Sequence, residues 1–376
     1  MKIESLRRKV AAAIGTAVAL VIVYLLAWPV PVEPLAWEAP PNPGYTGDFA
    51  VNERLKKIET FSIGDDAGPE AVAVDDQGRV YASTVDGRIL RLQSDGSDAE
   101  EWADTFGRPL GMEFDAAGNM IVADAIRGLL SVAPDGHVVA LATEADGIPI
   151  RYANEVDVAP DGRIYFSESS NKFAPIDWGG TYAAALLDIM EHGGHGRLLV
   201  YDPETESATA VLDGVNYANG VAVAHDGSFV LLAETGNYRV LRIWLSGPLI
   251  GTIEPFVEAL PGFPDNITRG LDGRYWIAFV SPRNPLIDRL AGHPFLRKMV
   301  QRLPAFVRPA ATHYGHVIAV DGDGQVVADL QDPDGAYPTI TEARETESYL
   351  WLGSLTAPVL GRIRMEDTGI RHPTDR

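Results

Sequence analysis

The chain of 376 residues contains no cysteine, which excludes disulfides, thiolate metal sites and a cysteine nucleophile. Basic residues are also scarce relative to acidic ones. Lys and Arg number 31 against 52 Asp and Glu, and the net charge is −21. Phosphate groups would be repelled by this charge, so no nucleic-acid partner is expected. The G-x-S-x-G motif of serine hydrolases is absent as well, which excludes a nucleophilic serine in that setting.

The first 28 residues form a separate unit, in which an uncharged run, 10–28, follows the basic residues Lys2, Arg7, Arg8 and Lys9. As a helix this run would span about 28 Å, close to the bilayer hydrocarbon thickness of about 30 Å. We expect a transmembrane signal anchor with a cytoplasmic N-terminus and the rest of the chain in the periplasm or outside the cell. A cleaved signal peptide is the alternative, but the run is long for one and Trp28-Pro29 is a poor cleavage site.

A proline-rich stretch follows the anchor, so we expect residues 29–59 to act as a semi-rigid linker. Residues 60–366 are expected to form one domain, followed by a tail, 367–376. With 37 glycines and 26 prolines, the composition suits a turn-rich β protein.

A repeat organises this domain. Five times a turn glycine lies eight residues after an equivalent start position, within alternating apolar and polar sequence typical of hairpins. The start positions are Glu70, Leu110, Asn154, Asn219 and Asp265, and a degraded sixth copy starts at Thr341. They are spaced by 40, 44, 65, 46 and 76 residues, whereas a four-stranded blade takes about 40–45. The pattern predicts an all-β fold, a six-bladed β-propeller rather than a β-sandwich.

The longer spacings leave room for two insertions with helical patterns, 181–195 and 283–310. The second carries six basic residues and one acid, Asp288, and its apolar residues recur at helical spacing. We expect it to form a short helical lid over the propeller mouth. A basic amphipathic segment that contacts anionic lipid is the alternative.

Equivalent start positions in a propeller surround one mouth of its central channel. Oxygen-bearing side chains would gather there, from Glu70, Asn154, Asn219, Asp265 and the adjacent Asn266. Calcium binds 6–8 oxygen ligands, so this set predicts a calcium site with positions left for water or substrate. Two alternatives stay open: these residues cap turns through their own side chains, or the ion is purely structural.

Several longer segments carry a family resemblance. They are PLGMEFDAAGNMIVADAIRGLLSV (109–132), 154–173, 218–251, 260–285 with its PDNITRGLDGRYW core, 332–335 and 349–363. The chain resembles the calcium-dependent six-bladed propellers of the gluconolactonase, senescence-marker-protein and paraoxonase group, especially the strictosidine-synthase-like branch. The resemblance implies the same five calcium ligands and makes Asp265 a base or nucleophile.

Two start positions depart from the relatives. Strictosidine synthase carries a glutamate at the sixth start, where this chain has Thr341, with Glu342 one residue away. Paraoxonases carry a histidine at the second start, where this chain has Leu110. Both residues are expected to line the substrate pocket. Neither is the catalytic glutamate or histidine that the relatives carry at the same position.

The predicted function is a membrane-anchored, calcium-dependent hydrolase of small-molecule esters or lactones, such as aryl esters. A non-enzymatic propeller with structural calcium is the main alternative. Carbon–nitrogen condensation is the third, and Thr341 makes it the least favoured.

Overall fold

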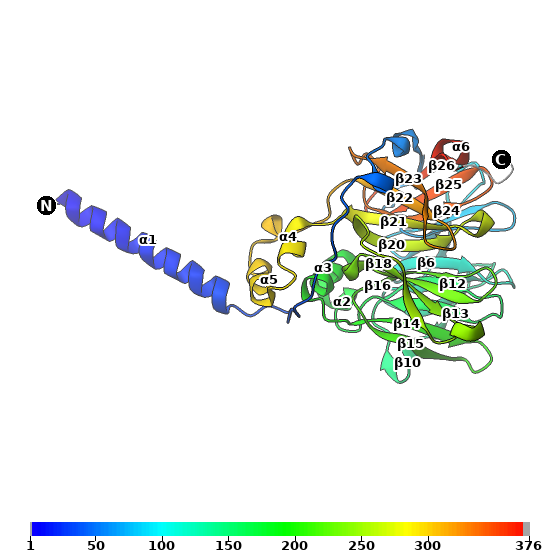
Figure 1. Ribbon diagram of the computed structural model, residues 1–376, viewed down its shortest axis with the longest axis horizontal. Helices are drawn as coiled ribbons and strands as arrows, with labels where there is room; N and C mark the ends of the chain where they lie inside the picture. The colour runs from blue at the N-terminus through cyan, green and yellow to red at the C-terminus, as the bar shows by residue number, and fades with distance from the viewer. Residues whose placement is uncertain (1, 371–376) are drawn as a thin grey trace.

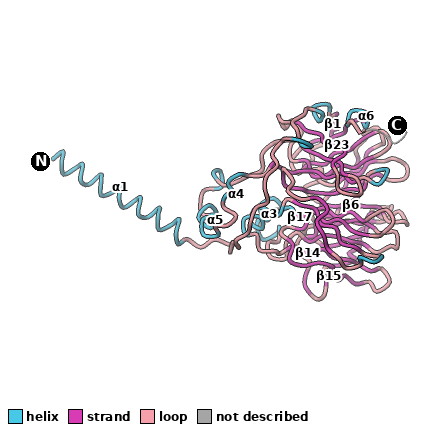
Figure 2. Tube along the Cα trace, viewed as in Figure 1, coloured by secondary structure: helices cyan, strands magenta, loops and turns pink. Residues whose placement is uncertain are grey.

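The computed structural model describes residues 2–370, and its main body is a ring of six four-stranded antiparallel sheets (Figures 1 and 2). A long helix, α1 (Lys2–Ala27), extends away from this body. The predicted all-β, six-bladed propeller with an N-terminal apolar helix is confirmed. The predicted tail begins within the last helix, and from residue 371 on it lies outside the described residues.

Each blade runs from an inner strand beside the channel to an outer strand at the rim. The first two blades are β2 (Val72–Val74), β3 (Val80–Ser83), β4 (Arg88–Leu92) and β5 (Glu100–Asp104), then β6 (Pro109–Phe114), β7 (Met120–Asp124), β8 (Gly128–Val132) and β9 (Val138–Ala142). The next two are β12 (Ala153–Val158), β13 (Ile164–Glu168), β14 (Gly196–Asp202) and β15 (Ser207–Val215), then β16 (Ala218–Val223), β17 (Phe229–Glu234), β18 (Arg239–Trp244) and β19 (Ile253–Val257). The fifth is β20 (Gly262–Arg269), β21 (Tyr275–Pro282), β22 (Gly315–Val320) and β23 (Val326–Asp332).

The sixth blade joins the two ends of the domain. It consists of β24 (Ile340–Glu345), β25 (Tyr349–Ser354), β26 (Val359–Arg364) and, as outer strand, β1 (Glu59–Ser62) from the start of the domain. Strand β1 pairs antiparallel with β26, with Glu59 opposite Arg362. Each inner strand also contacts the inner strands of both neighbouring blades. The ring is therefore closed by backbone hydrogen bonds between its first and last strands.

Five of the six start positions lie at irregularities of the inner strands, whereas Glu70 precedes β2. Pairing with the second strand shifts register between residues 109 and 111, 153 and 156, 218 and 221, 264 and 267, and 340 and 343. A bulge breaks the strict alternation of side chains along a strand. Neighbouring residues such as Asp265 and Asn266 therefore do not have to point to opposite faces.

Helices and short turns fill the connections. The α-helices are α2 (Pro175–Trp178), α3 (Thr181–Glu191), α4 (Pro285–Arg289), α5 (Pro294–Gln301) and α6 (Met365–Thr368). The 3-10 turns are η1 (Gly47–Phe49), η2 (Arg54–Lys57), η3 (Thr235–Asn237), η4 (Gly247–Leu249), η5 (Leu271–Gly273) and η6 (Ala305–Val307), and a small ribbon joins β10 (Glu144–Ala145) to β11 (Ile148–Pro149). Both predicted insertions are helical: 181–195 contains α3, which α2 precedes, and 283–310 contains α4 and α5. Figure 1 shows these helices at the end of the propeller that faces α1.

The linker after α1 does not stand clear of the domain. Val32 is fully buried against the propeller, and the backbone N–H groups of Glu33 and Leu35 donate to Glu191 at the end of α3. Trp37 stacks on His192 with ring centroids 4.1 Å apart. Proline keeps the segment extended, and these contacts attach it to the mouth of the propeller.

Close packing of inner strands generates a test of the fold. A Cβ on Gly220 would lie 2.4 Å from the Ile267 amide nitrogen and 2.6 Å from the Asp265 carbonyl oxygen. We expect Gly220→Ala to reduce the free energy of unfolding by about 1–3 kcal/mol, as overpacking of a rigid core does. Thermal denaturation measures this. Gly292→Ala, at a position with open space, is the control, and equal melting temperatures for the two variants would contradict the prediction.

Candidate functional site

A cavity that is partly open to solvent lies at the channel mouth beneath the helical insertions. Its polar side comes from four of the predicted start residues, each at most 6% exposed: Glu70, Asn154, Asn219 and Asp265. Its apolar side comes from the insertions and the fifth blade and includes Leu186, Ile189, Phe263, Val280 and Ile287. The propeller thus brings four of the five predicted metal ligands into one cavity.

The asparagines of this cavity have oxygens without hydrogen-bond partners. Asn154 donates its Nδ2 to Ser169 Oγ over 2.7 Å, and Asn219 donates its Nδ2 to Asp265 Oδ1. The Oδ1 atoms of both are buried and accept nothing. Asn266 does not line the cavity, but it is 1% exposed and neither of its amide atoms has a partner. A buried polar atom without a partner costs about 1–3 kcal/mol, so three such amides in one region are suited to binding a ligand.

The two carboxylates have different surroundings. Burial raises the pKa of Glu70, while the guanidinium of Arg108, with which Glu70 forms a buried ion pair, opposes the rise. Burial raises the pKa of Asp265 well above its usual range, and the charge of Glu70 raises it further. Asp265 has no basic partner among the described residues, only the amide of Asn219. A cation bound near both carboxylates would favour their ionised forms.

These residues fit a hard cation. Within residues 2–370 no cluster of three or more His, Cys, Asp or Glu side chains is arranged for a metal. The candidate set contains two carboxylates and three amide oxygens, and oxygen ligands of this kind suit calcium. All donor atoms of this set are oxygens, and it contains none of the histidine or cysteine ligands that zinc prefers.

The remaining two start residues lie behind the cavity surface. Leu110 is fully buried in a cluster with Tyr152 and Tyr217, which do line the cavity. Thr341 is also fully buried, and its hydroxyl donates to the Glu70 carbonyl oxygen over 2.7 Å. Neither is among the lining residues. Leu110 supports the cavity wall, and Thr341 holds the backbone of Glu70, a predicted metal ligand. Neither presents a reactive group to the cavity.

Three residues of the site were not predicted, and all occupy one repeat position. Arg108, Tyr152 and Tyr217 each lie two residues before a start position. The two hydroxyls are 2.8 Å apart, and Tyr152 donates to the Thr181 carbonyl oxygen. Phe263, at the same position of the fifth copy, also lines the cavity. An alignment of the residues two places before each start position predicts this second ring of residues.

Comparisons with known proteins agree with this architecture. The family model described as strictosidine synthase matches residues 154–248, and that described as strictosidine synthase-like, N-terminal, matches 47–92. The chain is 33% identical to adipocyte plasma membrane-associated protein of Rattus norvegicus, over 89% of this chain and 93% of that one. It is 36% identical to protein strictosidine synthase-like 10 of Arabidopsis thaliana, over 86% and 91%. The chain belongs to the strictosidine synthase-like family.

Solved structures extend the fold likeness of this strictosidine synthase-like chain beyond its family. A gluconolactonase from Xanthomonas campestris covers 88% of the chain, which covers 97% of it, with a TM-score of 0.59 and 18% identity. Regucalcin from Agrobacterium tumefaciens, a calcium-binding protein, covers 81%, with 93% of its own chain matched, a TM-score of 0.56 and 13% identity. At these identities the likeness concerns the fold.

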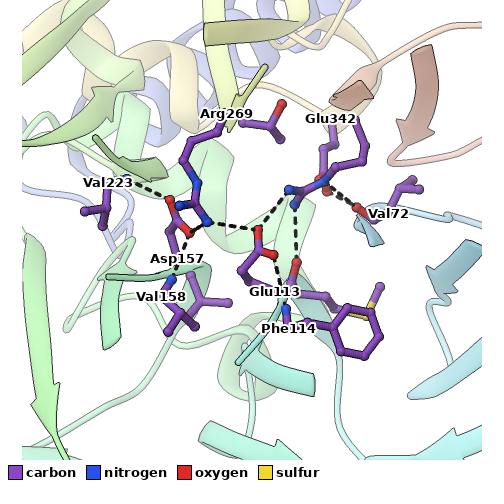
Figure 3. A network of polar contacts seen from close by, with 12 residues as sticks. Val72, Glu113, Phe114, Asp157, Val158, Val223, Arg269 and Glu342 are labelled. Carbon is purple, nitrogen blue, oxygen red and sulfur yellow. Dashed lines mark hydrogen bonds and ion pairs between the residues drawn. The ribbon is translucent and has the colours of Figure 1, made fainter. Parts of the chain in front are cut away.

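Deeper in the channel, the strictosidine synthase-like chain carries a network of buried charges (Figure 3). Arg344 contacts Glu113 at 2.8 Å and Glu342 at 3.0 Å, and Arg269 contacts Asp157 at 2.7 Å. Backbone N–H groups of Val72 and Val223 donate to Glu342 and Asp157. Burial raises the pKa of Glu342 and that of Asp157 to about 7, in opposition to the nearby arginines.

This network predicts a pH dependence of stability. A carboxyl pKa raised on folding contributes stability that is complete below the ordinary carboxyl pKa and is lost as pH rises through about 7. We expect the free energy of unfolding to fall between about pH 4 and pH 7, by at most about 1.4 kcal/mol per pH unit for each group. Denaturant titrations across this range measure the slope. Glu342→Gln should make it shallower, whereas Glu347→Gln, at an exposed position, should not. Equal slopes in all three proteins would refute the assignment.

Proposed function

We propose that this strictosidine synthase-like propeller is a membrane-anchored, calcium-dependent hydrolase of esters or lactones. The observation that carries the proposal is the cavity itself, in which two buried carboxylates and partnerless amide oxygens face apolar walls. Such a site suits a substrate with an apolar body and a polar carbonyl group. The fold likeness to a gluconolactonase is in keeping with this reaction class.

Calcium would be held by Glu70, Asn154, Asn219, Asp265 and Asn266. When bound, it supplies Lewis-acid stabilisation of the negative charge that develops on a substrate carbonyl oxygen. Regucalcin, a calcium-binding protein, has a related fold. The proposal for this chain rests on its own donors, because Asn154, Asn219 and Asn266 have buried oxygens without a hydrogen-bond partner and the carboxylates of Glu70 and Asp265 line the cavity.

Asp265 is the group proposed to act on the substrate, as a base toward water or as a nucleophile. The ion pair with Arg108 favours ionised Glu70, and that charge together with burial raises the pKa of Asp265. A carboxylate of raised pKa is a stronger base than an exposed one. Tyr152 and Tyr217 hold each other through their hydroxyls and fix one wall of the cavity.

The arrangement disfavours carbon–nitrogen condensation driven by a glutamate at the sixth start. Glu342 is fully buried and bound to Arg344 and to the Val72 N–H, away from the cavity lining. The Thr341 hydroxyl is engaged by the Glu70 carbonyl. No residue of the sixth start thus offers a carboxylate to the substrate.

The anchor assignment rests on α1. Glu4–Ala27 is the one described helix long and apolar enough to cross a membrane, and no part of it is buried by the propeller. Basic residues precede its apolar run, which favours a cytoplasmic N-terminus and a propeller in the periplasm or outside the cell. The name of the adipocyte relative, a plasma membrane-associated protein, agrees with a membrane location.

Asp265→Asn separates the proposed roles from folding, because the two side chains have nearly the same shape. We expect turnover of aryl esters and lactones to fall at least about 100-fold, as for loss of a general base. We also expect the calcium-induced rise in melting temperature to shrink, since a ligand stabilises only through the state that binds it. Asp98→Asn, at an exposed turn position, should leave both unchanged.

Two outcomes would contradict the hydrolase. Turnover that persists in Asp265→Asn, or in wild-type protein with excess chelator, would reject the proposed mechanism. Calcium stabilisation without turnover of any ester or lactone would favour the alternative, a non-enzymatic propeller held together by the ion.

A further inference from the structure

An apolar groove adjoins the candidate cavity near the end of α1. The groove is lined by Trp178 of α2, Leu187 of α3, Ala305 of η6 and Pro31 of the linker. It shares six lining residues with the cavity: Tyr182, Leu186, Ile189, Ile287, Pro309 and Ala310. The two spaces therefore share one wall and adjoin each other.

The groove lies beside the end of α1. Pro31 follows the last residue of α1, Ala27, by four positions, which an extended chain spans in at most about 14 Å. Arg302, which follows α5, donates to the carbonyl oxygens of Leu25 and Trp28 and so caps the C-terminus of α1. If α1 spans a bilayer, the groove opens next to the membrane surface.

Large apolar side chains are exposed around this opening. Phe306 is 88% exposed and Phe295 is 54% exposed, and both belong to the insertion that caps α1. Trp28, Ile176, Leu296 and Val307 are exposed as well. Exposed clusters of aromatic and aliphatic residues mark contact surfaces, and aromatic rings are favoured at the membrane–water interface.

Most basic residues of the insertion make contacts within the protein, unlike in the alternative in which they contact anionic lipid. Lys298 pairs with Glu33 of the linker, and Arg297 is fully buried and donates to the Leu35 and Met190 carbonyl oxygens. Arg283 pairs with Asp288, and Arg302 caps α1. Four of the six basic residues thus hold the linker, α1 and the insertion together. The exposed apolar side chains of the insertion are therefore the groups available to contact lipid.

We infer that this face of the propeller rests on the bilayer and that the substrate enters sideways from it, with a long acyl chain in the groove and its ester or lactone carbonyl at Asp265. The substrate class is then a membrane-partitioned amphiphile. This inference rests on the proposed function for the reaction, but the membrane contact and the chain-binding groove stand on their own geometry.

Chain-length dependence tests the groove. Full-length protein in phosphatidylcholine vesicles is assayed with aryl esters from acetate to decanoate. Each buried methylene should raise kcat/KM about fourfold until the groove is filled. Gln301→Trp adds bulk to the groove but does not touch the cavity lining. It should lower decanoate turnover at least about tenfold and leave acetate turnover unchanged.

A fluorescent long-chain fatty acid provides a readout without turnover. Wild-type protein should bind it, and Gln301→Trp should weaken binding at least about tenfold. If acetate is hydrolysed but neither chain length nor Gln301→Trp matters, the groove assignment is overturned. If no ester is hydrolysed, the proposed reaction fails, and fatty-acid binding alone decides on the groove.

Membrane contact is tested on the same vesicles. Because the chain has no cysteine, Phe306→Cys gives a single labelling site for an environment-sensitive fluorophore. We expect brominated acyl chains to quench this label and to leave unaffected a label on Val139→Cys, at an exposed position on the outer strand β9. Equal, weak quenching at both positions would overturn the membrane-facing arrangement.

Discussion

Six inner strands meet around one channel, and every polar side chain directed into that channel loses most of its contact with water. Such a group needs a partner, because an unpaired buried charge or amide is costly. Deep in the channel the requirement is met by two arginines, Arg269 and Arg344, set among carboxylates. At the mouth it is met only in part. Loss of water contact is offset by ion pairs deep in the channel. At the mouth it leaves amide oxygens without partners, which are free to bind a ligand.

The asymmetry between Glu70 and Asp265 follows from this constraint. Arg108 neutralises one carboxylate, so the pair does not place two bare charges side by side. Asp265 is left with an amide donor, burial and a nearby negative charge, all on the cavity surface. An isolated carboxylate in that setting either binds a proton or binds a cation. Ligand binding and proton affinity at this residue are thus two consequences of one environment.

Much of the architecture could be predicted from local sequence, because each blade repeats the same hairpin chemistry. Four of the six start residues carry a carboxylate or amide group, so aligning the repeats predicts that Glu70, Asn154, Asn219 and Asp265 lie together. The ring two residues earlier has no shared chemistry, with Arg108 and two tyrosines, and only its position repeats. The charged network was missed for another reason. Glu113 and Asp157 occupy alternating positions that look solvent-facing in a strand, and only closure of the ring buries Asp157 and partly covers Glu113.

Contacts between distant segments explain what else the sequence did not reveal. The strand that closes the ring pairs residues 59–62 with 359–362, and no sequence motif predicts that pairing. Similarly, Arg302 lies 274 residues from Trp28, whose carbonyl it caps. Both contacts bring the N-terminal segment onto the domain, one at the rim and one at the mouth. An anchor fixed at two places cannot act as a loose tether, so the position of the mouth relative to the end of α1 is set by the fold itself.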